Sequence, residues 1–182
     1  MSRVGESVFH SVHGLGVVEA IEEKHIQGKR ARFSVVNFHG LTVMVNLEHA
    51  GGLLRAPVSL SQAEQVLEYP GTPPEGPPPA GPPGQIYQGQ MSDLRSGDIY
   101  KLCDLLRTLT ATARARKLTP QQQDLGARAR ALLVQELAHV RGQAASVVED
   151  LVSQRLALIQ EEADYPGVEA VEPPSPGLGD EP

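Results

Sequence analysis

Histidines and a single cysteine are the residue types in this chain that most often bind metals or act as nucleophiles. Five of the six histidines fall within the first fifty residues, but no acidic residues accompany them at the spacing of a metal site. We interpret them as surface and turn residues: His10, His13, His25, His39 and His49. The lone Cys103 excludes an internal disulfide, and its place in an apolar stripe of helical period indicates a core residue.

The glycine and nucleophile motifs of common enzymes are also missing from the sequence. Gly14-Leu15-Gly16 lacks the third glycine and the following helix of a dinucleotide-binding fingerprint, and no G-x-x-x-x-G-K-[ST] phosphate loop occurs. No serine or cysteine lies in a recognisable nucleophile motif. We therefore predict a protein that is not an enzyme and that uses no cofactor or metal.

The run Leu41–Leu47 alternates in side-chain character, which is typical of a half-buried β-strand. Its odd-numbered residues are apolar and are expected to face a core. The residues expected to face outward are Thr42, Met44 and Asn46. A second strand is predicted at Arg30–Phe38, joined to the first by a tight hairpin at His39-Gly40. The alternation alone leaves open whether Met44 is an ordinary surface residue or a partner contact.

Three further strands and a short helix complete the first half. The strands are predicted at Gly5–His10, Gly16–Ile26 and Leu53–Val58. Short strands at this spacing predict a small, strongly bent sheet or barrel. A helix is predicted over residues 59–69, where Ser61 and Glu64 have the spacing of a capping box.

Residues 70–84 form a Pro/Gly-rich linker, because twelve of these fifteen residues are proline or glycine. Such a composition sustains neither helix nor sheet and favours an extended, partly stiff polyproline form. A proline-rich ligand for an SH3-like domain is the functional alternative for this stretch. The linker divides the chain into two predicted domains, residues 1–69 and residues 85–162.

The second domain is predicted to be a helical bundle, so the fold class is α+β. Apolar stripes at helical spacing predict three helices that begin near Asp98, Thr119 and Ser146, with a helical fragment before them. Thr119 is followed by Pro120 and, two positions later, by Gln122, which is typical of a helix start.

The net charge of −6 is concentrated in the C-terminal tail. From Glu161 onward there are seven acidic residues and no basic one, so the preceding chain holds 16 basic and 15 acidic residues. The acidic, Pro/Gly-rich end predicts a disordered tail over residues 163–182. No apolar stretch approaches membrane-spanning length, so we expect a cytoplasmic protein without a membrane partner. We also expect a monomer.

The helical domain carries basic residues that could contact a nucleic acid. They are Arg107, Arg114, Arg116, Lys117, Arg128 and Arg130. Solvated helix faces explain these residues about as well as a phosphate-contacting patch does.

Four stretches together carry a resemblance to a known family. They are V-H-G-L-G-V-V-x-x-I-E-E at Val12–Glu23, G-L-T-V-M-V at Gly40–Val45, L-R-S-G-D-I-Y at Leu94–Tyr100 and A-R-A-L-L-V-Q-E-L-A at Ala129–Ala138. From Gly5 to Ile159 the chain resembles the CarD family of bacterial transcription regulators, also called CdnL. Its first part is similar to the polymerase-interacting domain of transcription-repair coupling factors.

The resemblance implies a Tudor-like β domain, built as a small barrel, that docks on the β subunit of RNA polymerase. It also implies a helical domain that lies against promoter DNA at the upstream edge of the transcription bubble. Members of the family stabilise the open promoter complex, notably at ribosomal RNA promoters. The implied partners are therefore the polymerase and promoter DNA, and the implied location is the nucleoid, through the polymerase.

The family's contacts can be carried over to individual positions. Lys24 and Met44 occupy places where family members contact the β subunit, which favours a partner contact for Met44, and Thr42 and Asn46 flank it. The basic residues implied to face DNA are Arg114, Arg116, Lys117, Arg128 and Arg130. Tyr87 matches an aromatic residue that precedes the family's helical domain.

One departure from the family concerns the DNA contact. The family's tryptophan, an apolar wedge in the minor groove, falls on Pro83 here, and Gly84-Gln85-Ile86 replaces its basic neighbours. The chain contains no tryptophan at all. A wedge needs a large rigid side chain to unstack a base step, so we expect any DNA contact to be weak and to rely on phosphates.

Three functions follow from these patterns. The first is a regulator that binds the polymerase β subunit and modulates open-complex stability, including at ribosomal RNA promoters. The second is a divergent polymerase-binding adaptor that has lost direct contact with promoter DNA. The third is a stand-alone Tudor-like module for protein interaction.

Overall fold

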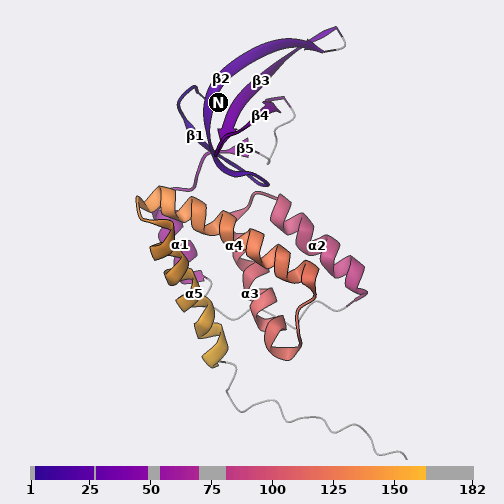
Figure 1. The fold of residues 1–182 in the computed structure, drawn as a ribbon, viewed down its shortest axis with the longest axis vertical. Coiled ribbons are helices and arrows are strands. Elements are labelled where there is room, and N and C mark those ends of the chain that lie inside the picture. The colour runs from indigo at the N-terminus through magenta and orange to yellow at the C-terminus, as the bar shows by residue number, and fades with distance from the viewer. Residues whose placement is uncertain (1–2, 27, 49–53, 70–80, 163–182) are drawn as a thin grey trace, which may run out of the picture.

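The computed structural model describes residues 3–26, 28–48, 54–69 and 81–162. Most of the predicted linker and the whole predicted tail lie outside these ranges. The described chain forms an antiparallel sheet followed by helices, which confirms the predicted α+β class (Figure 1). Within the described ranges, no helix is long and apolar enough to cross a membrane.

Five antiparallel strands form one sheet in the order β4-β3-β2-β1-β5. Their bounds are β1 Ser7–His10, β2 Gly14–Ile26, β3 Lys29–Phe38, β4 Leu41–Asn46 and β5 Leu54–Arg55. Of the strand predicted at Leu53–Val58, the described residues form a strand only at Leu54–Arg55, and Leu53 lies outside the described ranges. A register shift between Val18 and Ala20 marks a bulge in the long β2–β3 pair, and bulges bend sheets.

The β3–β4 hairpin turns at His39-Gly40, as predicted. Both residues have positive φ, 51° at His39 and 91° at Gly40, as the favoured two-residue hairpin turn requires. The Gly40 N–H donates to Oδ1 of Asn37 at 2.8 Å. This turn sets the register in which Phe38 pairs with Leu41 and Ser34 pairs with Val45.

The inner face of the sheet is a small hydrophobic core. It contains Val8, Val18, Val36 and Phe38, with Val43 packed beside them. Val45 is 8% exposed, so the predicted inward direction of Val43 and Val45 is confirmed. Leu41 was predicted to share that face, but it is 53% exposed because it adjoins the hairpin turn at the end of β4.

In the described part of the chain, five helices follow the sheet. They are α1 Leu60–Glu68, α2 Pro83–Arg95, α3 Ile99–Ala115, α4 Pro120–Arg141 and α5 Ala145–Glu162. Thr119 caps α4 and forms the predicted capping box with Gln122. The capping box of α1 is formed by Ser59 and Gln62, so the predicted pair Ser61 and Glu64 is wrong by two residues.

Two other helix starts differ from their predictions. Pro83 is the first residue of α2, so the helix begins inside the predicted linker. Proline is tolerated there because the first helical N–H has no partner within the helix. Ser146 lies inside the first turn of α5, where the N–H groups of Val147 and Val148 donate to the Ala144 carbonyl.

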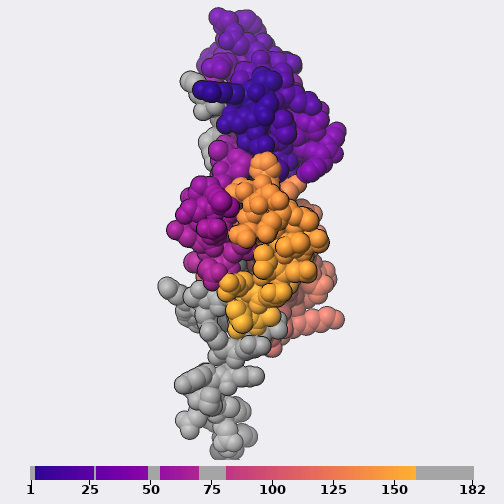
Figure 2. All heavy atoms as spheres, turned by 90° about the vertical axis from the view of Figure 1, so that its left-hand side faces the viewer, coloured from indigo at the N-terminus to yellow at the C-terminus, as the bar shows by residue number. Residues whose placement is uncertain are grey.

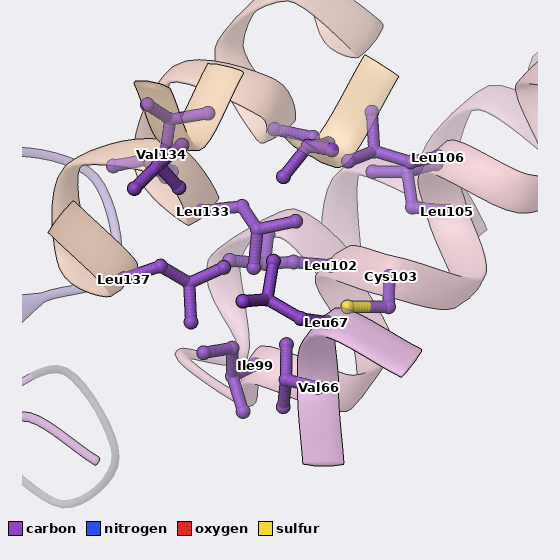
Figure 3. Packing of buried hydrophobic residues seen from close by; sticks show 14 of the residues in the cluster. Val66, Leu67, Ile99, Leu102, Cys103, Leu105, Leu106, Leu133, Val134 and Leu137 are labelled. Atoms are coloured by element: carbon purple, nitrogen blue, oxygen red, sulfur yellow. The ribbon is translucent and has the colours of Figure 1, made fainter. Parts of the chain in front are cut away.

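The helices share one large core that also takes in α1. Figure 3 shows Val66 and Leu67 of α1 pointing toward side chains of α3 and α4. Cys103 is fully buried in this core, as predicted. The division of the chain after residue 69 remains a prediction about folding units, although the buried residues of α1 belong to the core of the helices.

The strands and the helices are stacked end to end (Figures 1 and 2). α4 lies across the top of the helices, directly beneath the sheet (Figure 1). Its side chains contact the start of β2 at Leu15, and they contact β5 at Arg55.

Candidate functional site

The residues predicted to bind a partner lie together on the outer face of the sheet. In the register of β3 and β4, Thr42 pairs with Asn37, Met44 with Val35 and Asn46 with Phe33, all on the face opposite Val43 and Val45. Thr42 and Met44 are exposed, and Asn46 is half-buried.

Lys24 reaches the same face from β2. It pairs with Ala31 of β3, so β3 separates Lys24 from Met44. The Lys24 Nζ nevertheless lies 3.3 Å from the Met44 Sδ and also 3.3 Å from an oxygen of Glu22. Phe33 of β3 lies between Ala31, the partner of Lys24, and Val35, the partner of Met44, and it is only 9% exposed. The fold thus brings together two residues that are 20 positions apart in the sequence.

This arrangement suits protein recognition. A methionine thioether is flexible and polarizable and adapts to apolar partner surfaces, while the ammonium group beside it suits a partner carboxylate. β4 ends the sheet and, among the described strands, pairs only with β3. A terminal strand of this kind has backbone groups available to a partner segment.

The basic residues predicted to face DNA do not form one continuous patch. Arg114 lies in the last turn of α3, where a cation complements the helix dipole, and Arg116 and Lys117 follow as exposed residues at its end. Arg116 lines a cavity of about 570 Å³ together with Tyr87 and with Pro83 and Gly84, the first residues of α2. The half-buried Tyr87 also packs against the helical core.

The arginines of α4 have other surroundings. Arg128 is exposed, pairs with Asp124 at 3.0 Å and lines a separate groove of about 760 Å³ between the strand turns and the helices. Arg130 donates to Glu149 and to Ser153 Oγ of α5, both at 2.7 Å, and so contributes to helix packing.

Arg107 belongs to the helical packing as well. It is 3% exposed, pairs with Asp104 at 2.7 Å, and its guanidinium lies 4.7 Å from the centre of the Tyr69 ring. The group of basic residues that the sequence leaves open is therefore divided among three environments: the end of α3, the groove beside α4, and the packed interior.

Two histidines pack at the turn between β1 and β2. His10 and His13 have ring centres 4.8 Å apart, and both lie against Phe38. His10 accepts the N–H of Val12 at 3.1 Å, which agrees with its predicted role in the turn. It is buried rather than on the surface, and burial, with a smaller contribution from His13, lowers the pKa of His10. Across the described ranges, no group of histidine, cysteine and acidic residues could hold a metal ion.

Residues 83–153 match the family model described as CarD, C-terminal domain. Over these residues the chain is similar to the CarD C-terminal domain. The match starts at the first residue of α2 and ends within α5, and it confirms the resemblance read from the helical motifs.

The sequence patterns did not predict the residues that join the helices to the sheet. These are Phe9, Arg55, Gln135 and Glu136, described below. One signal was available, since Glu136 follows Leu132 by four positions and Leu133 by three and therefore falls on the apolar stripe of α4. A charged residue on such a stripe needs a buried partner.

Proposed function

We propose that this chain binds the β subunit of RNA polymerase through the outer face of its sheet and prolongs the life of the open promoter complex, including at ribosomal RNA promoters. The observation that carries the proposal is the contact between Lys24 Nζ and Met44 Sδ at 3.3 Å on an exposed face. It joins the two residues that the family resemblance assigns to the polymerase contact. The similarity of residues 83–153 to the CarD C-terminal domain supports this assignment.

Stabilisation of the open complex would follow from differential binding. Contacts made only when the promoter is melted shift the closed–open equilibrium toward the open state by their own free energy. The sheet would hold the protein on the polymerase, and the helical domain would contact DNA beside the bubble.

The DNA contact would be made to phosphates. Arg116 and Lys117 are exposed at the end of α3, and Arg116 shares its cavity with Tyr87. The family's wedge position is held by Pro83, which begins a helix and has no aromatic side chain to insert. Phosphate contacts position a protein without reading sequence, and they weaken steeply as salt rises.

The replacement Met44→Glu tests the polymerase contact. A residue near the centre of an interface contributes roughly 1–2 kcal/mol, so affinity for the isolated β-subunit lobe should fall about tenfold. Leu158→Glu on α5 is the matched control, because Met44 and Leu158 are 40% and 41% exposed. Calorimetry or surface plasmon resonance measures both variants. Unchanged binding by a folded Met44→Glu protein would remove this face from the proposal.

The second candidate is a polymerase-binding adaptor without direct DNA contact. Pro83 at the wedge position and the engagement of Arg130 in helix packing favour it. The two candidates differ in one result: the adaptor binds the β lobe but leaves the lifetime of open complexes unchanged. A stand-alone Tudor-like module would not bind the β lobe at all.

A further inference from the structure

The sheet and the helices are joined by an interlocked set of buried residues. Phe9 of β1 is fully buried, and its side chain belongs to the core of the helices rather than to the core of the sheet. The guanidinium of Arg55 in β5 lies 4.5 Å from the centre of the Phe9 ring. Phe9 and Arg55 are also direct partners in the β1–β5 register.

Arg55 forms a two-pronged ion pair with Glu136 of α4. Its Nη1 donates to Glu136 Oε1, and its Nη2 donates to Oε2 at 2.8 Å. The Glu136 side chain has no solvent exposure, whereas that of Arg55 is 26% exposed. The Nε of Arg55 donates to the Gly97 carbonyl at 2.6 Å, and the Val58 N–H donates to Glu136 Oε1 at 3.0 Å. One arginine therefore ties β5 to α4 and to the turn between α2 and α3.

The preceding residue of α4 makes a second connection. Gln135 accepts the Leu15 N–H at 3.0 Å, and its amide nitrogen donates to His39 Nε2 in the β3–β4 turn. Gly14 makes this approach possible, since a Cβ there would lie 2.0 Å from Gln135 Oε1. Two consecutive residues of α4 thus contact the sheet at different strands. Glu136 binds Arg55 of β5, and Gln135 binds Leu15 of β2 and His39 of the β3–β4 turn.

This junction has a specific geometric consequence. A bidentate guanidinium–carboxylate pair fixes both distance and orientation, and a buried carboxylate that loses its partner is strongly destabilised. Rotation of the sheet against α4 would separate Arg55 from Glu136 and leave the carboxylate buried without a counter-ion. The pair therefore selects one orientation of the two parts.

We infer that Arg55 and Glu136 are positioning residues that hold the sheet and the helical domain as one rigid body. Binding of the polymerase at Lys24 and Met44 then determines where the helical domain meets promoter DNA. This functional consequence rests on the proposed function, whereas the rigidity itself does not.

Distance distributions between two spin labels test the rigidity directly. In the full chain with Cys103→Ala, labels at Arg32→Cys in β3 and Ala127→Cys in α4 report on the two parts, and both native residues are exposed. Wild type should give one narrow distribution. Glu136→Gln should give a broad one, because a neutral amide cannot form the ion pair.

Two further variants complete this experiment. Arg55→Met with Glu136→Leu removes both charges, so it leaves no unpaired ion and should fold even where the single variant does not. It should melt near wild type and still give a broad distribution. Glu149→Gln is the control, since it breaks the Arg130–Glu149 pair inside the helical body and should leave the distribution narrow. Narrow distributions in both junction variants would overturn the inference.

The functional consequence has its own measurement. The double variant should bind the isolated β lobe as wild type does, but its prolongation of open-complex lifetime should be reduced roughly fivefold or more. Full retention of the lifetime effect by a variant with a broad distance distribution would refute the positioning role. If wild type itself leaves the lifetime unchanged, the proposed function fails, and the distance distributions still decide whether the junction is rigid.

Discussion

Met44 and Val45 are neighbours on β4 with opposite surroundings. Met44 is 40% exposed beside Lys24 on the outer face, and Val45 is 8% exposed on the inner face, where it pairs with Ser34. Because successive side chains of a strand alternate between faces, the hairpin register alone decides which of them is available to a partner.

This difference predicts the effect of a charge at each face. Val45→Asp would bury an unpaired carboxylate and should reduce the free energy of unfolding by about 3 kcal/mol or more. Thr42→Asp on the exposed face of the same strand is the control, and surface changes of this kind stay within about 0.5 kcal/mol. Urea unfolding measures both. Equal unfolding midpoints for the two variants would mean that the inner face of β4 is misassigned.

Cys103 provides a second prediction at this scale. Burial, helped by the nearby carboxylate of Asp104, raises the pKa of the Cys103 thiol to about 12. The thiolate is the reactive form, so the folded protein should react with a disulfide reagent at pH 8 only as fast as it unfolds. Because the raised pKa lies above that of the unfolded chain, the folded state retains a proton that the unfolded state releases. This contribution to stability is present below the ordinary pKa of a thiol and is lost as pH rises toward 12.

Stopped-flow labelling at several urea concentrations measures the reactivity of the thiol. The labelling rate should rise with urea in parallel with the unfolding rate. Rapid labelling in the absence of urea would show that the thiol is accessible in the native protein.

At the scale of elements, close packing at the start of β2 explains the H-G-L-G motif physically. Gly14 has a φ of 76° and faces α4, and a Cβ at Gly16 would lie 2.6 Å from the ring of Phe38. Both glycines allow close approach, one toward the helical domain and one inside the sheet.

Gly14→Ala and Gly28→Ala separate backbone strain from the contact with α4. Their φ values are 76° and 78°, but a Cβ at Gly28 would meet nothing within 4 Å. Both substitutions should lower the free energy of unfolding by about 1–2 kcal/mol, because alanine is strained at positive φ. Gly14→Ala should lower it further, because Gln135 must move. Thermal unfolding of the two variants gives the difference. Equal losses of unfolding free energy would show that α4 does not restrict the space at Gly14.

The local elements were predictable because their signals are local. Alternation located β4 and its faces, and the Thr119-Pro120 start of α4 was found because the cap and the first turn are adjacent in sequence. The cap of α1 was misplaced because Ser59 with Gln62 and Ser61 with Glu64 have the same spacing and similar chemistry. Only the observed helix start distinguishes them.

The pairing of residues at the junction was not predictable, because the partners are distant in sequence. Arg55 and Glu136 are 81 positions apart, and nothing beside Arg55 marks it as half of a buried pair. The sequence around Phe9 predicts only an ordinary strand residue, although Phe9 packs into the core of the helices. The outer-face site was located only through the family resemblance, since alternation leaves the role of Met44 open.

At the scale of the whole molecule, the environments of the basic residues predict separate effects. Replacing Arg114 and Arg116 with glutamine should shorten the lifetime of open complexes and reduce its salt dependence, because phosphate contacts are lost.

Arg130→Gln should mainly lower thermal stability, since Arg130 donates to Glu149 and Ser153. Tyr87→Ala should change the lifetime little, because Tyr87 packs against the helical core. Loss of the whole effect in Tyr87→Ala alone would mean that this tyrosine acts as the wedge.

The lifetime of open promoter complexes tests the proposed function most directly. Complexes formed on a ribosomal RNA promoter are challenged with a competitor, and their decay is followed without the protein, with wild type and with Met44→Glu. Wild type should lengthen the lifetime, and folded Met44→Glu at the same concentration should have a much smaller effect. Equal decay with and without wild type, at a concentration that saturates the β lobe, would contradict the proposal.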